Sequence, residues 1–128
     1  MAQVKVYGRR SVWAGRTGEV SDALQDALVA AWALPPEKRF HRFLLLDDDE
    51  LVAPGRGPGY LVVEVICFAG RSDAAVRRLV RALTDDGAPG LGLPVDDLEA
   101  VVVEVPASRW AIRGRAGDEL TLDYRVDV

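Results

Sequence analysis

Residues 60–68 read YLVVEVICF and are followed at 69–72 by AGRS. β-branched and aromatic residues favour strands, so this run predicts a strand that ends at the corner. Beyond the corner, apolar residues recur at the spacing of one helix face, at Val76, Leu79, Val80 and Leu83. A second apolar run, VVVEV at 101–105, follows. The order strand, helix, strand predicts a β-α-β unit.

The beginning of the chain repeats this order of features. Residues 4–8 predict a strand, 9–11 (RRS) form the corner, a helical stripe follows, and 40–46 (FHRFLLL) predict a second strand. We therefore expect pseudo-repeats at about 3–46 and 60–106, which predict an α+β fold: a two-layer, duplicated β-α-β architecture with two helices on one face of the sheet. Each corner carries arginine, at a place where the N–H groups of a helix N-terminus can help to hold an anion.

The predicted helices differ in how clearly their ends are marked. Residues 19–34 predict the first helix, with Thr17 or Ser21 as its cap. Ser72 predicts the cap of the second helix. The following stretch 84–92 is rich in Gly, Asp and Pro, which predicts that the second helix ends there.

The C-terminal part of the chain, 107–128, lies outside the two repeats. Residues 110–114 predict a loop, and the alternation of apolar and polar residues at 120–126 predicts a terminal strand at a sheet edge or across to another subunit. A chain of 128 residues is long enough for one ordinary core and too short for two. We therefore take residues 1–128 as a single domain.

The predicted strands point to self-association. Residues 61–66 and 101–105 are apolar at nearly every position, which is typical of strands that are covered on both faces. Two helices cover only one face of a sheet. We therefore expect a partner subunit on the other face.

Composition excludes several classes of function. The net charge of −4 gives no overall attraction to nucleic acid or to an anionic membrane. One histidine, His41, and one cysteine, Cys67, cannot supply a common metal-ligand set, so we expect neither a metal nor a cofactor. A lone cysteine forms no disulfide within the chain, and no apolar run approaches the ~20 residues of a spanning helix. These features favour a cytoplasmic protein.

Arg71 is the candidate for a binding residue. A cation just before a helix opposes the helix dipole by a few tenths to ~1 kcal/mol, so its position needs a reason. One reason is a carboxylate or phosphate held by the guanidinium together with helix N–H groups. The other is structural: the side chain turns to solvent, or pairs with an acidic neighbour such as Asp73.

Three short stretches carry a family resemblance: 34–40 (LPPEKRF), 68–72 (FAGRS) and 108–114 (SRWAIRG). With the two β-α-β units, they make the chain resemble the tautomerase superfamily, and within it the longer, duplicated members near malonate semialdehyde decarboxylase. The resemblance implies a mixed sheet and a homotrimer of β-α-β-β-α-β protomers. It also implies catalysis by an amino-terminal proline, which acts as general acid or base on a small enolisable substrate.

Some of the site residues that the resemblance implies are present in this sequence, and others are replaced. Position 2 is Ala2 in place of proline, so removal of Met1 would expose a primary amine with an ordinary pKa of about 7.7–8.0. Arg71 matches the arginine that holds the substrate carboxylate, whereas Ala69 replaces a second arginine. Three further residues are assigned to substrate binding: Lys38, where the family pattern has an acidic residue, Trp110 as an aromatic wall, and Arg113.

Two functions remain open, and a third is disfavoured. The first is a keto–enol isomerase that acts on a small carboxylate-bearing substrate, with Ala2 and Arg71 as catalytic residues. The second is a catalytically inactive, trimeric binding or structural homologue. An RRM-like nucleic-acid module also uses two β-α-β units, but it needs exposed aromatic residues on its strands and a basic surface.

Overall fold

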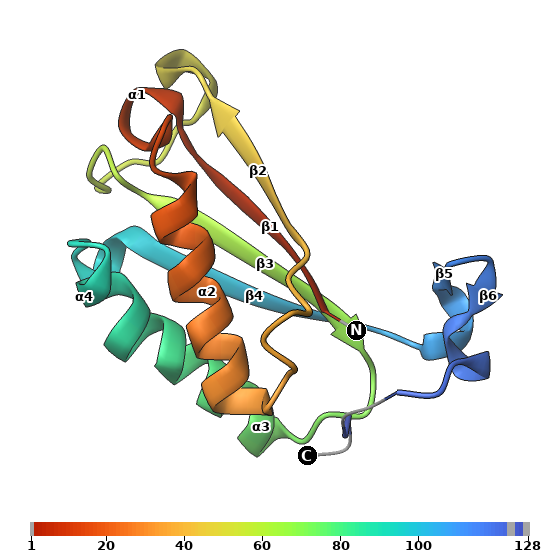
Figure 1. Cartoon of the computed structure of the whole chain (residues 1–128). Coiled ribbons are helices and arrows are strands. Elements are labelled where there is room, and N and C mark those ends of the chain that lie inside the picture. Colours follow the sequence, from red (N-terminus) through yellow and green to blue (C-terminus); the bar gives the residue numbers. More distant parts are fainter. Residues whose placement is uncertain (1, 123–124, 127–128) are drawn as a thin grey trace.

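A mixed four-stranded sheet forms the centre of the molecule (Figure 1). The structure, a computed structural model, describes residues 2–122 and 125–126. The strands are β1 (Ala2–Arg9), β2 (His41–Leu46), β3 (Leu61–Phe68) and β4 (Leu98–Val105), in the order β2-β1-β3-β4. Each repeat contributes one parallel pair, β1 with β2 and β3 with β4, and the repeats join through the antiparallel pair of β1 and β3. The predicted α+β fold class is confirmed.

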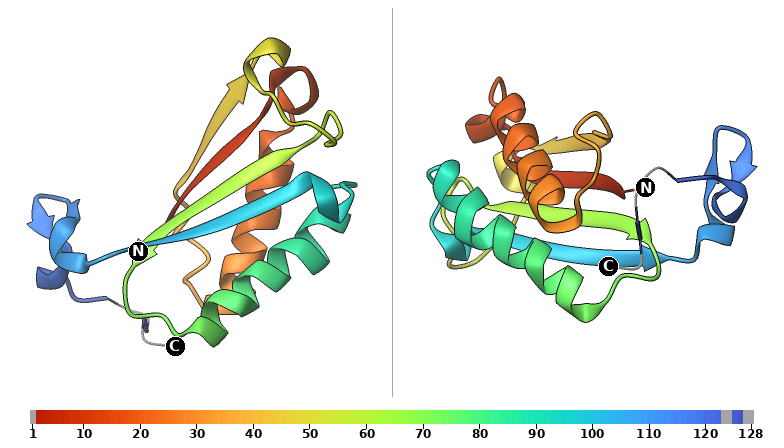
Figure 2. Two further views of the ribbon diagram at one scale, coloured as in Figure 1. Left: turned by 180° about the vertical axis from the view of Figure 1, so that it is seen from behind. Right: turned by 60° about the horizontal axis from the view of Figure 1, so that its bottom comes forward.

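Two long helical segments cover one face of this sheet (Figure 2). The first is α2 (Thr17–Trp32), which ends where Ala33 takes a left-handed conformation, with φ 52°. The predicted start at residue 19 and the predicted side-chain caps are wrong. Arg16 occupies the N-cap position and no side chain caps the helix. The sequence also gave no sign of the short helix α1 (Arg10–Trp13), because a single turn has no periodicity to read.

The second helical segment is built from two α-helices joined by a π-helix. Helix α3 (Asp73–Arg81) begins as expected, with the Ser72 hydroxyl accepting a hydrogen bond from the backbone N–H of Ala75 at 3.1 Å. It then runs on through a π-helix (Ala82–Gly87) into α4 (Ala88–Gly90), so the segment ends within the predicted stretch 84–92. The wider π turn, in which the N–H of Ala88 bonds to the carbonyl of Leu83, carries the chain past its glycine and proline residues.

The core lies between the helices and the face of the sheet that they cover. Alternate residues of the central strands point into it, including Val4, Val6, Val63 and Val65. Two tryptophans, Trp13 and Trp32, are each 1% exposed and close the two ends of this layer. Cys67, also 1% exposed, is a free cysteine that is buried in this core.

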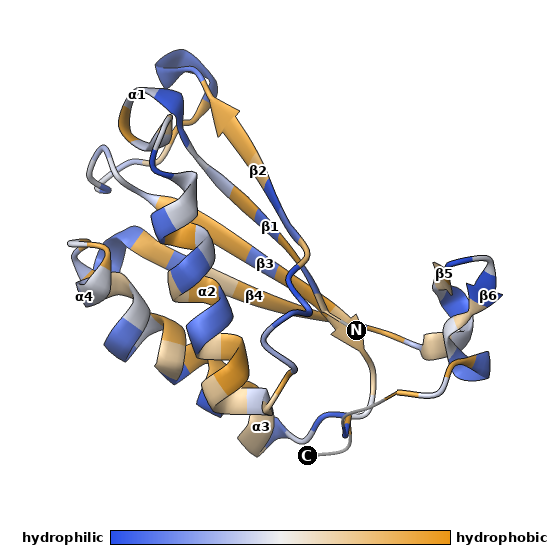
Figure 3. Cartoon of the chain, viewed as in Figure 1, coloured by the Kyte–Doolittle hydropathy of each residue, from blue (hydrophilic) through white to orange (hydrophobic). Residues whose placement is uncertain are grey.

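The other face of the sheet, which we call the open face, has no helix over it (Figure 2, left). The register places a set of apolar side chains there: Tyr7, Leu44, Leu46, Val62, Ile66, Val101, Val103 and Val105. The strands are correspondingly hydrophobic along most of their length (Figure 3). Val101 and Val103 remain 47% and 41% exposed, and an ion pair between Lys5 and Glu64 at 3.8 Å lies in the middle of this face.

After β4 the chain leaves the sheet and forms a small hairpin that stands apart from it (Figure 1). Strands β5 (Ala111–Ile112) and β6 (Arg115–Ala116) are joined by Arg113 and Gly114, both with positive φ, as a tight two-residue hairpin turn requires. Residues 110–114, expected to be a loop, are therefore partly strand.

The predicted terminal strand does not form within the chain at the residues that the structure describes, and its crossing to another subunit stays a prediction. Residues 120–122 and 125–126 adopt no strand, and the rest of that prediction, Asp123 and Tyr124, lies outside the described residues. Alternation gives a segment strand propensity, but a strand also needs a neighbour to pair with.

Short 3-10 turns complete the structure, at Asp48–Glu50, Val95–Asp97, Ala107–Arg109 and Gly117–Glu119. In the described part of the chain, no helix has the length and apolar character needed to cross a membrane.

Candidate functional site

Arg71 is buried at the corner where β3 leads into α3. Only 8% of its surface is exposed, and within the described residues neither Nε nor Nη1, both buried, has a hydrogen-bond partner. No ion pair between Arg71 and Asp73 is found there. The side chain therefore follows neither structural alternative predicted from the sequence, because it neither turns to solvent nor pairs with its acidic neighbour.

The partner of Arg71 is an aromatic ring. The guanidinium carbon lies 3.8 Å from the centroid of the Trp32 ring, the last residue of α2. The Trp32 indole N–H donates a hydrogen bond of 2.9 Å to the carbonyl of Ala75, in the first turn of α3. Trp32 of α2 and Ala75 of α3 thus join the two helices at this corner.

Cys67 connects this corner to the start of the first strand. In the antiparallel pair of β1 and β3, Ala2 lies opposite Cys67, and Ala2 is 6% exposed. Burial raises the pKa of the Cys67 thiol to about 11, although the nearby Arg71 guanidinium favours the thiolate and partly opposes that rise. Burial also lowers the pKa of Arg71, an effect that Cys67 and Glu104 oppose. Ala2, Cys67 and Arg71 therefore lie close together in the structure.

The equivalent corner of the first repeat is built differently. Arg9 donates hydrogen bonds to three backbone carbonyls, those of Leu51, Gly57 and Pro58, at 3.0–3.4 Å. Arg10 bonds to the carbonyl of Leu45 at 2.7 Å and pairs with Asp47. The arginines of this corner hold the following loops in place. Of the two predicted anion-binding corners, only the second keeps buried guanidinium donors that have no hydrogen-bond partner among the described residues.

Lys38 lies in the loop that leads from α2 to β2. The side-chain amide of Gln25, which is 2% exposed, donates hydrogen bonds to the carbonyls of Pro36 and Lys38 at 3.2 and 3.3 Å. The loop rejoins the sheet where the N–H of Val4 bonds to the carbonyl of Phe40. Lys38 is therefore fixed through its backbone close to the start of β1.

Trp110 and Arg113 belong to the segment that follows β4. The Trp110 ring packs edge-on against Phe68, with centroids 5.2 Å apart. Phe68 and Cys67 are adjacent in β3, so their side chains point to opposite faces of the sheet. Arg113 is exposed at the hairpin tip. Within one chain, Trp110 and Arg113 do not gather with Arg71, and their assignment to substrate binding stays a prediction.

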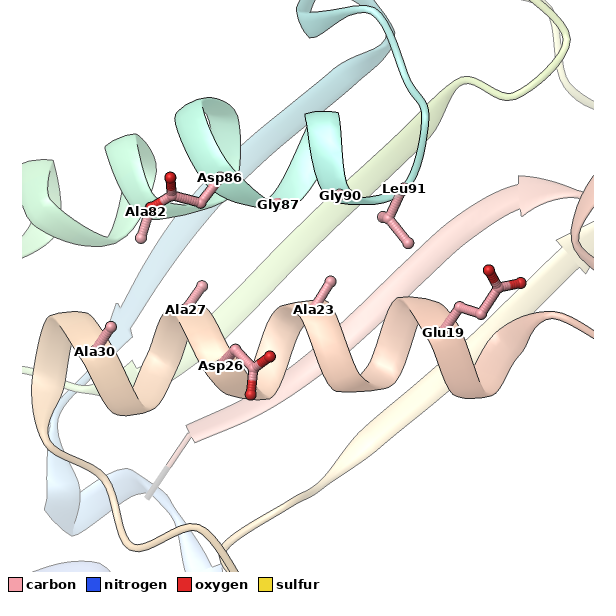
Figure 4. A pocket seen from close by; sticks show the side chains of 10 residues that line it. All are labelled: Glu19, Ala23, Asp26, Ala27, Ala30, Ala82, Asp86, Gly87, Gly90 and Leu91. Atoms are coloured by element: carbon pink, nitrogen blue, oxygen red, sulfur yellow. The ribbon is translucent and has the colours of Figure 1, made fainter.

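The helix layer contains a groove away from this corner (Figure 4). It has a volume of about 450 Å³ and runs between α2 and the segment from the π-helix to α4. Its walls are mostly small residues, with Glu19, Asp26 and Asp86 among those that line it. None of the five site residues predicted from the sequence lines it.

Comparison with known proteins identifies the family. A family model described as "Tautomerase enzyme" matches residues 38–113, which is more than half of the chain. The chain belongs to the tautomerase superfamily. This finding confirms the resemblance stated above and agrees with the duplicated β-α-β topology of the sheet.

Solved structures similar to this tautomerase superfamily member extend over almost the whole chain. FG41 malonate semialdehyde decarboxylase inhibited by 3-bromopropiolate has 25% sequence identity and a TM-score of 0.80, covering 94% of this chain and 98% of that one. Native fused 4-OT has 23% identity and a TM-score of 0.82, covering 92% and 98%. The F6 fused 4-OT asymmetric trimer has 23% identity and a TM-score of 0.80, covering 91% and 96%. This fused 4-OT is described as a trimer.

Sequence reasoning missed two members of the Arg71 corner, Trp32 and Cys67. Both are buried, Trp32 at the end of α2 and Cys67 in β3. Their contact with Arg71 depends on how the end of α2 packs against the start of α3. No spacing in the sequence encodes that packing.

Proposed function

We propose that this protein is a keto–enol isomerase that acts, as a homotrimer, on a small substrate carrying a carboxylate. The observation that carries the proposal is the buried guanidinium of Arg71, whose Nε and Nη1 have no partner among the described residues. Leaving such donors unsatisfied is costly, by about 1–3 kcal/mol each and more for charged groups. A carboxylate oxygen would satisfy them with charge-assisted hydrogen bonds.

The amine of Ala2 is the proposed proton carrier, once Met1 has been removed. Its strand position opposite Cys67 supports this role, because Cys67 in turn neighbours Arg71. The free amine would take the proton from the enol hydroxyl, and the resulting ammonium would give a proton to the neighbouring carbon. The products are the keto form and the regenerated amine. Arg71 would hold the carboxylate and so orient the reacting carbon.

A trimer is part of the proposal because of the open face. Its apolar side chains, including the half-exposed Val101 and Val103, need a cover that the described part of the chain does not provide. The similar fused 4-OT structures that are described as trimers support this arrangement. Lys38, Trp110 and Arg113 would contribute to substrate binding in that assembly.

The second candidate is a trimer that binds an anion without turnover. Ala2 favours it, because a primary amine replaces the secondary amine of the family's proline. Both candidates share the Arg71 corner and differ only in the proton carrier.

Turnover separates the two candidates. The assay follows ketonisation of phenylenolpyruvate, after mass spectrometry has shown whether the purified chain begins at Met1 or Ala2. For an isomerase we expect measurable activity, a higher rate in Ala2→Pro, and loss of activity in Arg71→Ala but not in the control Arg16→Ala, whose arginine stacks on Trp13 at 4.6 Å. A retained Met1 with no activity in any variant would leave the binding protein as the function.

A further inference from the structure

We propose that Trp32 is a positioning residue for anion binding: its ring holds the Arg71 guanidinium by one face, so that the edge N–H groups stay available for the carboxylate. This inference rests on the proposed function of Arg71. It assigns a role to a residue of α2 that belongs to neither the chain start nor the corner 69–72.

The Arg71 guanidinium meets the Trp32 ring through a cation–π contact, and its N–H donors lie at the edges of the guanidinium plane. The guanidinium carbon is 3.8 Å from the Trp32 ring centroid, so the cation is in contact with the ring. All five N–H groups of a guanidinium lie in its plane, and a cation–π contact uses none of them. Nε and Nη1 accordingly remain without partners among the described residues.

The ring itself is rigidly held. Trp32 is 1% exposed, and its indole N–H donates a 2.9 Å hydrogen bond to the carbonyl of Ala75. The N–H of Ala75 in turn bonds to the cap residue Ser72, adjacent to Arg71 in the chain. The ring and the arginine are therefore fixed to the same first turn of α3.

The kind of group that contacts Arg71 decides which of its N–H donors remain available for a ligand. An acidic residue would neutralise the cation and occupy its donors, and backbone carbonyls would occupy them too, as they do at Arg9. Burial disfavours the charged form of Arg71, and a π face offsets part of that penalty without taking a donor. Trp32 thus keeps the guanidinium charged and buried without occupying Nε or Nη1.

Binding calorimetry with phenylpyruvate tests the inference. The variants are Trp32→Phe, which keeps a ring, and Trp32→Leu, which removes it. Trp13→Leu is the matched control, since Trp13 is also 1% exposed, also donates its indole N–H to a carbonyl (Gly59, 3.1 Å) and also stacks with an arginine, Arg16. We expect Kd to rise about tenfold in Trp32→Leu and about threefold in Trp32→Phe, and to stay unchanged in folded Trp13→Leu.

A purely structural role for Trp32 predicts a different result. In that case folded Trp32→Leu and Trp13→Leu would have the same Kd as the wild type, which would overturn the inference. If Trp32→Leu fails to fold, the Kd of Trp32→Phe is compared with that of the wild type instead. An equal Kd would overturn the inference. The double variant with Arg71→Ala adds a second check, because Trp32→Phe should then have no further effect on Kd.

A measurement without ligand keeps this inference distinct from the proposed function. In ¹⁵N NMR, the Nε–H of Arg71 should exchange with water at least about tenfold faster in Trp32→Phe than in the wild type. If the wild type does not bind phenylpyruvate, the proposed function fails, and unchanged exchange would overturn the positioning role as well. Faster exchange without binding would support the positioning of Arg71 while overturning its link to this anion.

Discussion

Ala2 and Cys67 lie directly opposite one another in the antiparallel pair of β1 and β3, and both side chains are buried. This pairing joins the start of the first repeat to the end of the equivalent strand in the second. Because Cys67 also neighbours Arg71, one register brings the chain start close to the only corner whose buried arginine donors lack partners among the described residues. The predictions below test the burial, assembly and charge that this arrangement depends on.

The Cys67 thiol should be almost unreactive in the folded protein. Its pKa is raised to about 11 by burial, against a reference of 9.0, so the thiolate fraction near pH 8 falls about 100-fold. We expect the reaction with Ellman's reagent to be at least about 100-fold slower in the native protein than in guanidinium chloride. Rapid modification of the native protein would show that this part of β3 is accessible.

The Ser72 cap should contribute measurably to stability. Its hydroxyl accepts the N–H of Ala75 at 3.1 Å, and removing such a cap costs about 1 kcal/mol. Ser72→Ala should therefore lower the free energy of unfolding by about that amount in urea titrations. Ser108→Ala is the control: it removes an exposed serine in the 3-10 turn after β4, and it should change little. Equal stability of the two variants would contradict the cap.

The parts of the fold that depend on residues close together in the chain could be predicted from the sequence. The strands of both repeats and the Ser72 cap are confirmed, since β-branched runs and cap chemistry act locally. The second helix ends within the predicted stretch 84–92, but the π turn that carries it past Gly87 and Pro89 could not be predicted from local residue preferences. The superfamily is confirmed, but the contact of Arg71 with Trp32 could not be predicted, since it depends on two helix ends that are far apart in the sequence.

The open face should control the oligomeric state. Val101 is 47% exposed on this face, and a lysine there would have to be buried in an interface between subunits. Val101→Lys should shift the mass measured by light scattering from trimer towards monomer. Val52→Lys, at an 85% exposed loop residue, should leave the mass unchanged. A trimer that tolerates Val101→Lys would place the interface elsewhere.

His41 should make stability depend on pH. Burial, and then the charge of Arg39, lower the pKa of His41 from 6.5 to about 4. A hydrogen bond of 2.7 Å joins its ring nitrogen Nδ1 to the hydroxyl of Ser21. Below pH 6.5 the unfolded chain binds a proton that the folded chain binds only near pH 4. The contribution of neutral His41 is therefore complete above pH 6.5 and is lost as the pH falls from 6.5 towards 4.

A comparison with His41→Gln isolates this contribution. Between pH 7 and pH 4.5 the wild type should lose about 1–3 kcal/mol more unfolding free energy than the variant, a range that allows for screening at a partly buried site. Parallel stability curves for the two proteins would show that His41 titrates normally in the folded state.

The central claim is that the buried guanidinium of Arg71 holds a carboxylate. The most direct measurement is the crystal structure of the protein soaked with phenylpyruvate, together with calorimetry on Arg71→Ala. We expect a carboxylate oxygen within hydrogen-bond distance of Arg71 and a Kd at least about tenfold weaker in the variant. A ligand bound away from Arg71, or equal affinity in Arg71→Ala, would contradict the claim.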